Sequence, residues 1–345
     1  MSTGFVAPGF DTVREAFERE PRGGSALAVL QDGEPVVDLC EGWRDPARTV
    51  AWDADTLVDV YSVGKPVIAL ALLILLERGL VALDDPVARH WPEFRADATL
   101  RHALTHTAGL PAFPVKRPVE AWADWDLLCA DLAGATPEWP PGTVPAEHAL
   151  TYGHLIGEIV RRVDGRPPAR FVAEEIAGPY GCDFGFGLGT ADIARCADLE
   201  YDAPDWPARN SGEPGSVRAR AVENPPGARD VAVVNGDLWR SASIPAVNLH
   251  STAMAIARLY RELMTRPVGA TMATAQVEGF DLFVGGRTVW GLGVQLEPDG
   301  SWGMGGLGGN AGWADPGRGQ AIAYVTRRLG DFDTVTRIEQ ALAES

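Results

Sequence analysis

The sequence predicts an α/β plus α fold, in which an antiparallel sheet is flanked by helices and a mainly helical region is inserted. Strand-like apolar segments occur near both ends of the 345-residue chain. A long apolar helix follows the first of them, and the middle of the chain is rich in Pro, Trp and short helical patterns. With 46% hydrophobic and 22% charged residues, the chain is long enough to bury a large core.

The N-terminal segment predicts a helix followed by a hairpin. Apolar residues recur at helical spacing within residues 10–20. Two short apolar runs, residues 25–30 and 35–41, flank Asp32-Gly33. Because Asp-Gly between apolar runs is a strong hairpin signal, we expect these runs to pair as antiparallel strands.

The next long element is a helix predicted over residues 56–79. Its second half, VIALALLILLERGL, is apolar on every face, which is typical of a helix in the middle of a large protein. The longest apolar run, residues 66–76, is well short of the roughly 20 residues that a membrane-spanning helix needs. We therefore expect no membrane segment.

The middle of the chain predicts irregular connections, and its end predicts strands and a helix. Two Pro-rich or Gly-rich stretches, residues 136–145 and 210–236, predict long irregular connections, which in compact proteins are usually functional or mobile. Residues 289–296 and 320–326 predict sheet strands, and residues 331–343 predict an amphipathic closing helix.

These elements predict one unit over residues 1–345 with two subdomains. Residues 1–90 and 270–345 supply the α/β subdomain, and residues 91–269 supply the mainly helical one. Such an arrangement brings the two ends of the chain together in one sheet.

Charge and cysteine content limit the classes of binding partner and the cellular compartment that we expect. The chain carries 30 basic and 47 acidic residues, a net charge of −17, so nucleic acid and anionic membrane would be repelled. The four cysteines are scattered without CxxC spacing, and the N-terminus has no basic stretch leading into an apolar run. We expect reduced thiols in a cytoplasmic protein whose partner is a small-molecule substrate.

Ser62 and Lys65 form the strongest chemical signal in the sequence. They lie three residues apart at the entry to the apolar helix, so one turn of helix would bring the ammonium to the hydroxyl. A serine hydroxyl is a poor nucleophile until a base removes its proton. Burial disfavours a charged lysine and so lets it act as that base, which arginine cannot do.

The choice of lysine supports this interpretation. Lys65 and Lys116 are the two lysines of the chain, and its other basic residues are arginines. The alternative is that Ser62 caps the helix and Lys65 is solvated in its first turn. A cation there opposes the helix dipole, which weakens that alternative.

Together with these residues, four segments resemble the serine β-lactamase and penicillin-binding family, nearest to class C β-lactamases and the β-lactamase-like (family VIII) carboxylesterases. The segments are VYSVGK with the following ALALLILLERGLVALDDPVARHWPEF, then TLRHALTHTAGLP, PGTVPAEHALTYGHLIGEIVRRVDGR and GMGGLGGNAGWADPGRGQAIAYV. The resemblance implies an α/β domain built from both termini, a helical domain between them, and a catalytic site in the cleft.

The second motif of that family is altered here. The family has a tyrosine, in Y-x-N or Y-H-A, that shares a proton with the lysine, and HALTYG puts Glu147 at its place. Tyr152 lies five residues further on, and a register in which residues 152–154 serve as Y-x-N stays open. A carboxylate beside Lys65 favours the ammonium form. Either Glu147 takes the Ser62 proton, or acyl chemistry has been lost.

The third motif also differs from the family pattern. Met304-Gly305-Gly306 stands where the family has K-T-G or H-x-G, so the basic residue is missing. The glycines still allow a strand edge to approach a substrate. The resemblance implies that the backbone amides of Ser62 and Leu307 form the oxyanion hole.

Further residues are candidates for the substrate cleft. The third-motif residues belong to it by the resemblance, and His154 belongs to it if the Y-x-N register holds. The aromatic candidates are Phe113, Trp125 and Trp313, because the family places comparable loops at the mouth of its cleft. For each of these three, packing in the core is the alternative.

No cofactor and no metal is expected. His102 and His106 have a spacing that suits zinc, but no HExxH and no nearby carboxylate completes a site. Gly303, Gly305 and Gly308 match a dinucleotide fingerprint, but a strand rather than a helix follows them, which fails the structural requirement.

Together, the residues and the resemblance predict a serine hydrolase that acts on an ester, amide or lactam through a Ser62 acyl-enzyme. Two alternatives remain. An acyltransferase would pass the same acyl group to an alcohol or amine, and a ligand-binding homologue would keep the fold without turnover.

Overall fold

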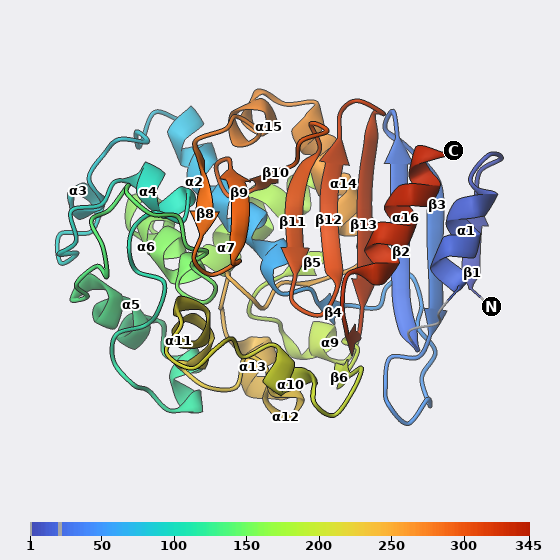
Figure 1. Cartoon of the computed structure of the whole chain (residues 1–345), viewed down its shortest axis with the longest axis horizontal. Helices are drawn as coiled ribbons and strands as arrows, with labels where there is room; N and C mark the ends of the chain where they lie inside the picture. The colour runs from blue at the N-terminus through green and yellow to red at the C-terminus, as the bar shows by residue number, and fades with distance from the viewer. Residues whose placement is uncertain (1, 20–22) are drawn as a thin grey trace.

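A computed structural model describes residues 2–19 and 23–345 of the chain (Figure 1). These residues form a nine-stranded antiparallel sheet with the strand order β1-β3-β2-β13-β12-β11-β10-β9-β8. Its strands are β1 Thr3–Val6, β2 Gly24–Gln31, β3 Glu34–Gly42, β8 Val277–Asp281, β9 Gly286–Trp290, β10 Gln295–Leu296, β11 Trp302–Gly306, β12 Asn310–Asp315 and β13 Gln320–Thr326. The predicted antiparallel sheet flanked by helices is therefore confirmed.

Two small sheets and a set of helices complete the described chain. The small sheets pair β14 Arg328–Leu329 with β6 Glu200–Tyr201, and β4 Val58–Asp59 and β5 Phe184–Gly185 with β7 His250–Ser251. The longer helices are α1 Asp11–Glu18, α2 Lys65–Glu77, α5 Trp125–Ala133, α6 Tyr152–Asp164, α11 Val217–Glu223, α14 Ala253–Met264, α15 Pro267–Met272 and α16 Asp333–Ala343. Shorter ones are α3 Val87–His90, α4 Leu100–Leu104, α7 Pro168–Val172, α8 Gly178–Tyr180, α9 Thr190–Ile193, α10 Trp206–Arg209, α12 Val231–Val234 and α13 Asp237–Ser241, with the 3₁₀ helices η1 Ser62–Gly64 and η2 Val119–Ala123 and the π-helical segment η3 Ala173–Ala177.

The N-terminal hairpin forms as predicted. Strands β2 and β3 pair in antiparallel register, and the turn between them places Asp32 at φ 50° and Gly33 at φ 92°. Positive φ at both turn residues matches the twist of the flanking strands, which is why Asp-Gly predicts this hairpin. The expected helix over residues 10–20 is α1, and residue 20 lies outside the described residues.

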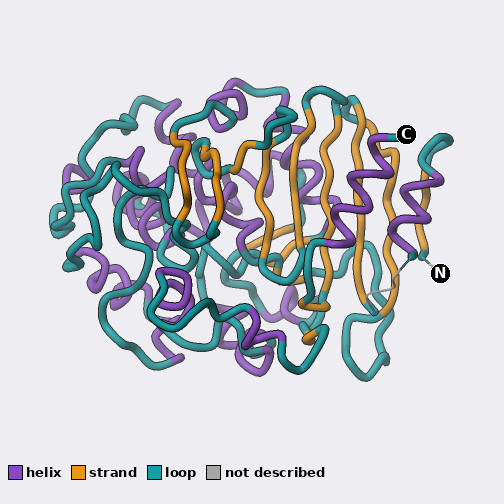
Figure 2. Tube along the Cα trace, in the orientation of Figure 1, coloured by secondary structure: helices purple, strands orange, loops and turns teal. Residues whose placement is uncertain are grey.

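The sheet separates two apolar layers. Leu27 and Val29 pack with α1 and α16 on one face, while Ala28 and Leu30 belong to the larger core that contains α2 and α14. This alternation follows from the period of two along a strand. Figure 1 shows α1 and α16 on the same face of the sheet, and Figure 2 shows the strands gathered beside a region of helices and loops.

The buried helix begins later than its sequence predicts. Residues 58–59 form β4, which pairs with β7, and η1 comes next, so α2 begins at Lys65 rather than near residue 56. Pro66 suits the first turn of a helix, where its missing N–H is not needed. Apolar periodicity alone did not reveal the strand because its partner lies far along the chain.

Two other predictions from the sequence need correction. The expected strand over residues 289–296 folds back on itself: Trp290 of β9 pairs with Gln295 of β10, and Gly293 between them has φ 81°. The expected irregular connection over residues 210–236 contains α11 and α12. The strand over residues 320–326 is β13 as predicted, and α16 begins at Asp333.

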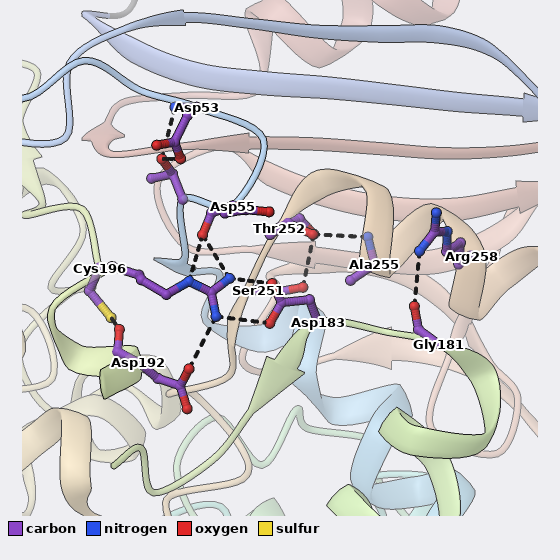
Figure 3. A network of polar contacts seen from close by, with 12 residues as sticks. Asp53, Asp55, Gly181, Asp183, Asp192, Cys196, Ser251, Thr252, Ala255 and Arg258 are labelled. Carbon is purple, nitrogen blue, oxygen red and sulfur yellow. Dashed lines mark hydrogen bonds and ion pairs between the residues drawn. The ribbon is translucent and has the colours of Figure 1, made fainter. Parts of the chain in front are cut away.

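A polar network fastens the helical region to the segment that leads to Ser62 (Figure 3). The Arg195 guanidinium donates to the backbone carbonyl of Asp55 at 2.8 Å and pairs with the carboxylates of Asp183 and Asp192. Together with the pairing of β4 to β7, this network fixes the approach to the nucleophile helix.

Among the residues described, no helix combines the length and the apolar character that crossing a membrane requires. Both ends of the chain supply strands of the large sheet. The subdomain boundaries at residues 90 and 270 stay a prediction.

Candidate active site

Ser62 and Lys65 meet at the start of α2. Ser62 opens the 3₁₀ turn η1, and Lys65 begins the helix one turn later. The Lys65 Nζ donates to Ser62 Oγ at 2.6 Å and to the backbone carbonyl of Ala246 at 3.2 Å. Because the Lys65 side chain is fully buried, its amine is held against the hydroxyl without competing water.

Glu147 is the acidic partner of Lys65. Its Oε1 lies 3.0 Å from Lys65 Nζ, and its side chain is almost buried. Burial lowers the pKa of Lys65, and the charge and hydrogen bond of Glu147 offset part of that shift. A lysine with a lowered pKa loses its proton more readily than a solvated one, which suits a base.

Three backbone contacts fix the loop that carries Glu147. The Ala146 N–H donates to the carbonyl of His106 at 3.0 Å, and the His148 N–H donates to His106 Nδ1 at 3.1 Å. The Glu147 N–H donates to Asp281 Oδ1 at 3.1 Å. Glu147 is therefore positioned by groups that lie far from it in the sequence.

The histidines beneath this loop are neutral packing groups. Burial, with the nearby charges of His148 and Lys65, holds the pKa of His106 well below its usual range. Burial likewise lowers the pKa of His148 to about 4. His102 belongs instead to the capping box of α4 with Thr99, so the two histidines at zinc-like spacing have separate structural roles.

Tyr61, directly before the nucleophile, has a strained backbone. Its φ is 50° and its ψ is −127°, a conformation that side chains other than glycine rarely adopt. Its N–H donates to Asp59 Oδ1 at 2.9 Å, and Asp59 Oδ2 accepts from Trp239 Nε1 at 2.8 Å. The sharp turn at Tyr61 presents Ser62 at the surface of the adjoining cavity.

That cavity has a volume of about 220 Å³. Ser62 and Glu147 line it together with residues of β11 and the turn that follows, namely Met304, Gly305, Gly306 and Leu307. A Cβ at Gly306 would lie 2.2 Å from the carbonyl oxygen of Val60. Glycine at this position therefore lets the end of β11 approach the segment that carries Ser62.

Tyr152 lies away from the Ser62–Lys65 pair. As the first residue of α6 it is fully buried, its hydroxyl donates to the carbonyl of Leu104 at 3.3 Å, and its ring packs 4.6 Å from that of His106. Burial raises its pKa. In the described residues it is thus Glu147, and not Tyr152, that contacts Lys65. Tyr152 lies five residues after Glu147, at the start of α6, and so points into a different part of the core.

Four expected cleft residues lie outside the cavity as the described residues define it: Phe113, Trp125, His154 and Trp313. His154 follows Tyr152 into α6 and stacks on Trp125, 4.6 Å between ring centroids. Phe113 packs edge-on against His154, and Trp313 packs against the apolar layer under α1 and α16. This part of the expectation is corrected for the Ser62 cavity, since none of the four side chains lines it; Phe113 and Trp313 line other hollows.

The structure adds residues to the cavity that sequence reasoning missed: Tyr61, Asn210, Arg218, Val222, Arg229, Phe283, Gln295 and Phe332. Several of them lie within residues 210–236. The length of that connection was the one sequence feature that could have pointed to the cavity, because long connections in compact proteins are often functional. No local spacing identified the individual side chains.

The glycines that match a dinucleotide fingerprint lie in a hairpin beside the Ser62 cavity. Gly303, Gly305 and Gly308 belong to the β11–β12 hairpin, so the strand that was expected to follow them is present. Their role is to bring β11 close to its neighbours.

The fold is that of a known class of protein. The model of the beta-lactamase family matches residues 11–345. The chain is 35% identical over 340 residues to esterase/beta-lactamase LipL of Mycobacterium tuberculosis, which covers 89% of this chain and 77% of LipL. The chain therefore belongs to the beta-lactamase family.

Two further comparisons agree. Esterase EstB of Burkholderia gladioli is 33% identical over 227 residues, which is 59% of this chain and 57% of EstB. The crystal structure of a family VIII carboxylesterase superimposes with a TM-score of 0.90 at 29% identity, over the whole of both chains. These likenesses support serine hydrolase activity of the carboxylesterase type.

Proposed function

We propose that the chain hydrolyses a small ester through an acyl-enzyme on Ser62. The observation that carries the proposal is the contact of 2.6 Å between Lys65 Nζ and Ser62 Oγ, inside a buried ion pair with Glu147. The relatives are named esterase/beta-lactamase LipL and esterase EstB. Esterase stands in both names, which favours an ester over an amide or lactam.

In the proposed acylation, Lys65 handles the proton. Neutral Lys65 accepts the Ser62 hydroxyl proton while Oγ forms a bond to the acyl carbon. The ester C–O bond then breaks, and the leaving alkoxide takes the proton from Lys65. Glu147 holds Nζ in place and accepts the proton that Lys65 must give up beforehand. Lys65 rather than Glu147 is the base because its Nζ contacts the hydroxyl.

In the proposed deacylation, water replaces the alcohol and the same groups act in reverse order. The backbone amides of Ser62 and Leu307 are proposed to bind the developing oxyanion. Both residues line the cavity, which supports the assignment.

The test is intact mass measurement after brief exposure to a p-nitrophenyl ester, with peptide mapping and the Ser62→Ala variant as control. We expect an acyl adduct on Ser62, or nitrophenol release that Ser62→Ala lacks. A folded protein that gives neither adduct nor nitrophenol would contradict the proposal and favour a ligand-binding homologue. A rate increase with an added acceptor alcohol, with ester product, would indicate acyl transfer instead.

We further propose a cytoplasmic location. In the described part of the chain all four cysteines are free thiols, which suits a reducing compartment.

A further inference from the structure

The cavity at Ser62 contains an unusual amount of positive charge for this protein. The chain as a whole has a net charge of −17, yet Arg218 of α11 and Arg229 both line the cavity. The other charged pair there, Lys65 with Glu147, is neutral in sum. The two arginines therefore give the cavity a net positive charge.

Neither arginine forms a salt bridge with any residue that the structure describes. The Arg218 guanidinium lies over the ring of Phe283, 5.5 Å from its centroid. Arg229 Nη1 donates to the carbonyl of Pro207 at 3.1 Å and to Ser211 Oγ at 2.6 Å. Its Nε is buried and has no hydrogen-bond partner in the described chain.

A neighbouring arginine shows the contrast. Arg220, one turn from the start of the same helix, pairs with the Glu138 carboxylate on another side of α11. Most arginines of the described chain have a carboxylate partner in this way, whereas Arg218 and Arg229 have none within ion-pair distance. Two like charges near each other cost stability, and an anion between them removes that cost.

Tyr61 adds a hydrogen-bonding group to the same wall. Its side chain lines the cavity and is almost fully buried, and its hydroxyl has no partner among the described residues. The charge of Arg229 is close enough to favour ionisation of the Tyr61 phenol, although burial outweighs it and raises the pKa of Tyr61. Buried polar groups are normally hydrogen-bonded, so this hydroxyl is available to a ligand group.

We propose that the substrate is an ester that bears a carboxylate, bound by Arg218 and Arg229. This inference rests on the proposed esterase function and names its substrate class. Guanidinium groups bind carboxylates through strong, charge-assisted hydrogen bonds. The apolar side chains of Val222, Phe283 and Phe332 line the same cavity and suit a short hydrocarbon chain between the ester and the carboxylate.

The test measures binding apart from turnover, by calorimetry on the Ser62→Ala variant. Two anionic esters place the carboxylate on different sides of the ester bond: monomethyl glutarate on the acyl side and 3-acetoxypropionate on the alcohol side. Each is compared with its neutral methyl ester. We expect at least one anionic ester to bind about 10- to 100-fold more tightly than its neutral counterpart.

Arginine variants in the Ser62→Ala background identify the residues responsible. Arg218→Gln is expected to bring the ratio of the two dissociation constants close to 1, and Arg229→Gln to reduce it. Arg220→Gln, on the same helix, is expected to keep the ratio of the parent. A variant that loses general binding ability would weaken both ligands alike, so the ratio remains informative.

Equal binding of both anionic esters and their neutral counterparts would overturn the inference, and so would a ratio that neither arginine variant changes. Turnover by the protein with Ser62 intact is measured separately. Hydrolysis without a carboxylate preference refutes the inference and leaves the esterase proposal standing. A carboxylate preference in binding without hydrolysis of any ester supports the anion site and refutes the esterase proposal.

Discussion

At Lys65, burial and an ion pair act on one pKa in opposite directions. Burial lowers the pKa, and Glu147 raises it part of the way back. The balance determines how much neutral amine is present to accept the Ser62 proton.

This balance gives a prediction for Glu147→Gln. Glutamine removes the charge that raises the pKa of Lys65, so the acid limb of the profile of kcat/KM against pH moves to lower pH. Glutamine also cannot accept a proton, and we expect kcat/KM at the optimum to fall about 100-fold. The measurement is hydrolysis of a p-nitrophenyl ester between pH 5 and 9.

The matched variant is Tyr152→Phe, which removes the hydrogen bond to Leu104. We expect it to keep the specificity constant and to lose about 1 kcal/mol of unfolding free energy. If Tyr152→Phe abolished turnover while Glu147→Gln left it intact, Glu147 would not be the partner of Lys65.

Some site residues were predictable from the sequence and others were not. Ser62 and Lys65 lie one helical turn apart, so their contact follows from local geometry. Glu147 followed from its place in a motif. Arg218 of α11 and Arg229, which lies between α11 and α12, reach the cavity because that region folds against the Ser62 segment and β11. No spacing in the sequence encodes that approach.

Among the elements, the β8–β9 hairpin holds the loop of Glu147. Asp281, at the end of β8, accepts through Oδ1 from the backbone N–H groups of Glu147, Phe283 and Val284, and through Oδ2 from Trp290 Nε1. It is fully buried. One carboxylate therefore joins the second motif to a wall of the cavity.

We expect Asp281→Asn to destabilise this junction. The amide NH₂ would face a donor, either Trp290 Nε1 or the three backbone N–H groups, which leaves a buried donor without an acceptor. The unfolding free energy should fall by about 2–3 kcal/mol, and kcat should fall because Glu147 shifts. Urea unfolding and steady-state kinetics measure the two effects.

Glu278→Gln is the control on the same strand, because Glu278 makes an exposed ion pair with Arg287. Its unfolding free energy should change by less than about 0.5 kcal/mol. An Asp281→Asn protein as stable as Glu278→Gln would show that the four hydrogen bonds of Asp281 do not hold the Glu147 loop to the hairpin.

A helix or strand could be predicted where the residues that determine it lie close together in the sequence. The β2–β3 hairpin and α16 follow from turn chemistry and periodicity. The start of α2 and the fold-back of β9 onto β10 were missed, because β4 pairs with a strand nearly 200 residues away and the turn at Gly293 interrupts a continuous apolar run.

For the whole molecule, buried histidines determine much of the acid stability. Burial lowers the pKa of His148 to about 4, and that of His154 and His250 to about 3. These folded-state values lie below the unfolded value of about 6.5. The stability contributed by each histidine is therefore present above pH 6.5 and is lost as the pH falls toward the folded value.

We expect the unfolding free energy to decrease as the pH falls from 6.5 to 4, by about 1.4 kcal/mol per pH unit for each histidine that remains neutral in the fold. His154→Phe keeps a ring against Trp125 and removes one such group, because neither ring nitrogen of His154 has a partner in the described chain. Urea midpoints at several pH values should then show a shallower slope. An unchanged slope would mean that His154 is already protonated in the fold.

The pairing of β2 with β13 has a consequence for biosynthesis. Gln31, the last residue of β2, lies opposite Gln320, the first residue of β13, so the first strands leave the ribosome long before their partner is made. At about 5–20 residues per second, the wait is roughly 15–60 s. During it, one edge of β2 has no partner strand, and this edge is prone to aggregate or to bind chaperones. Removing the last three strands would therefore expose the nascent core instead of releasing a smaller stable domain.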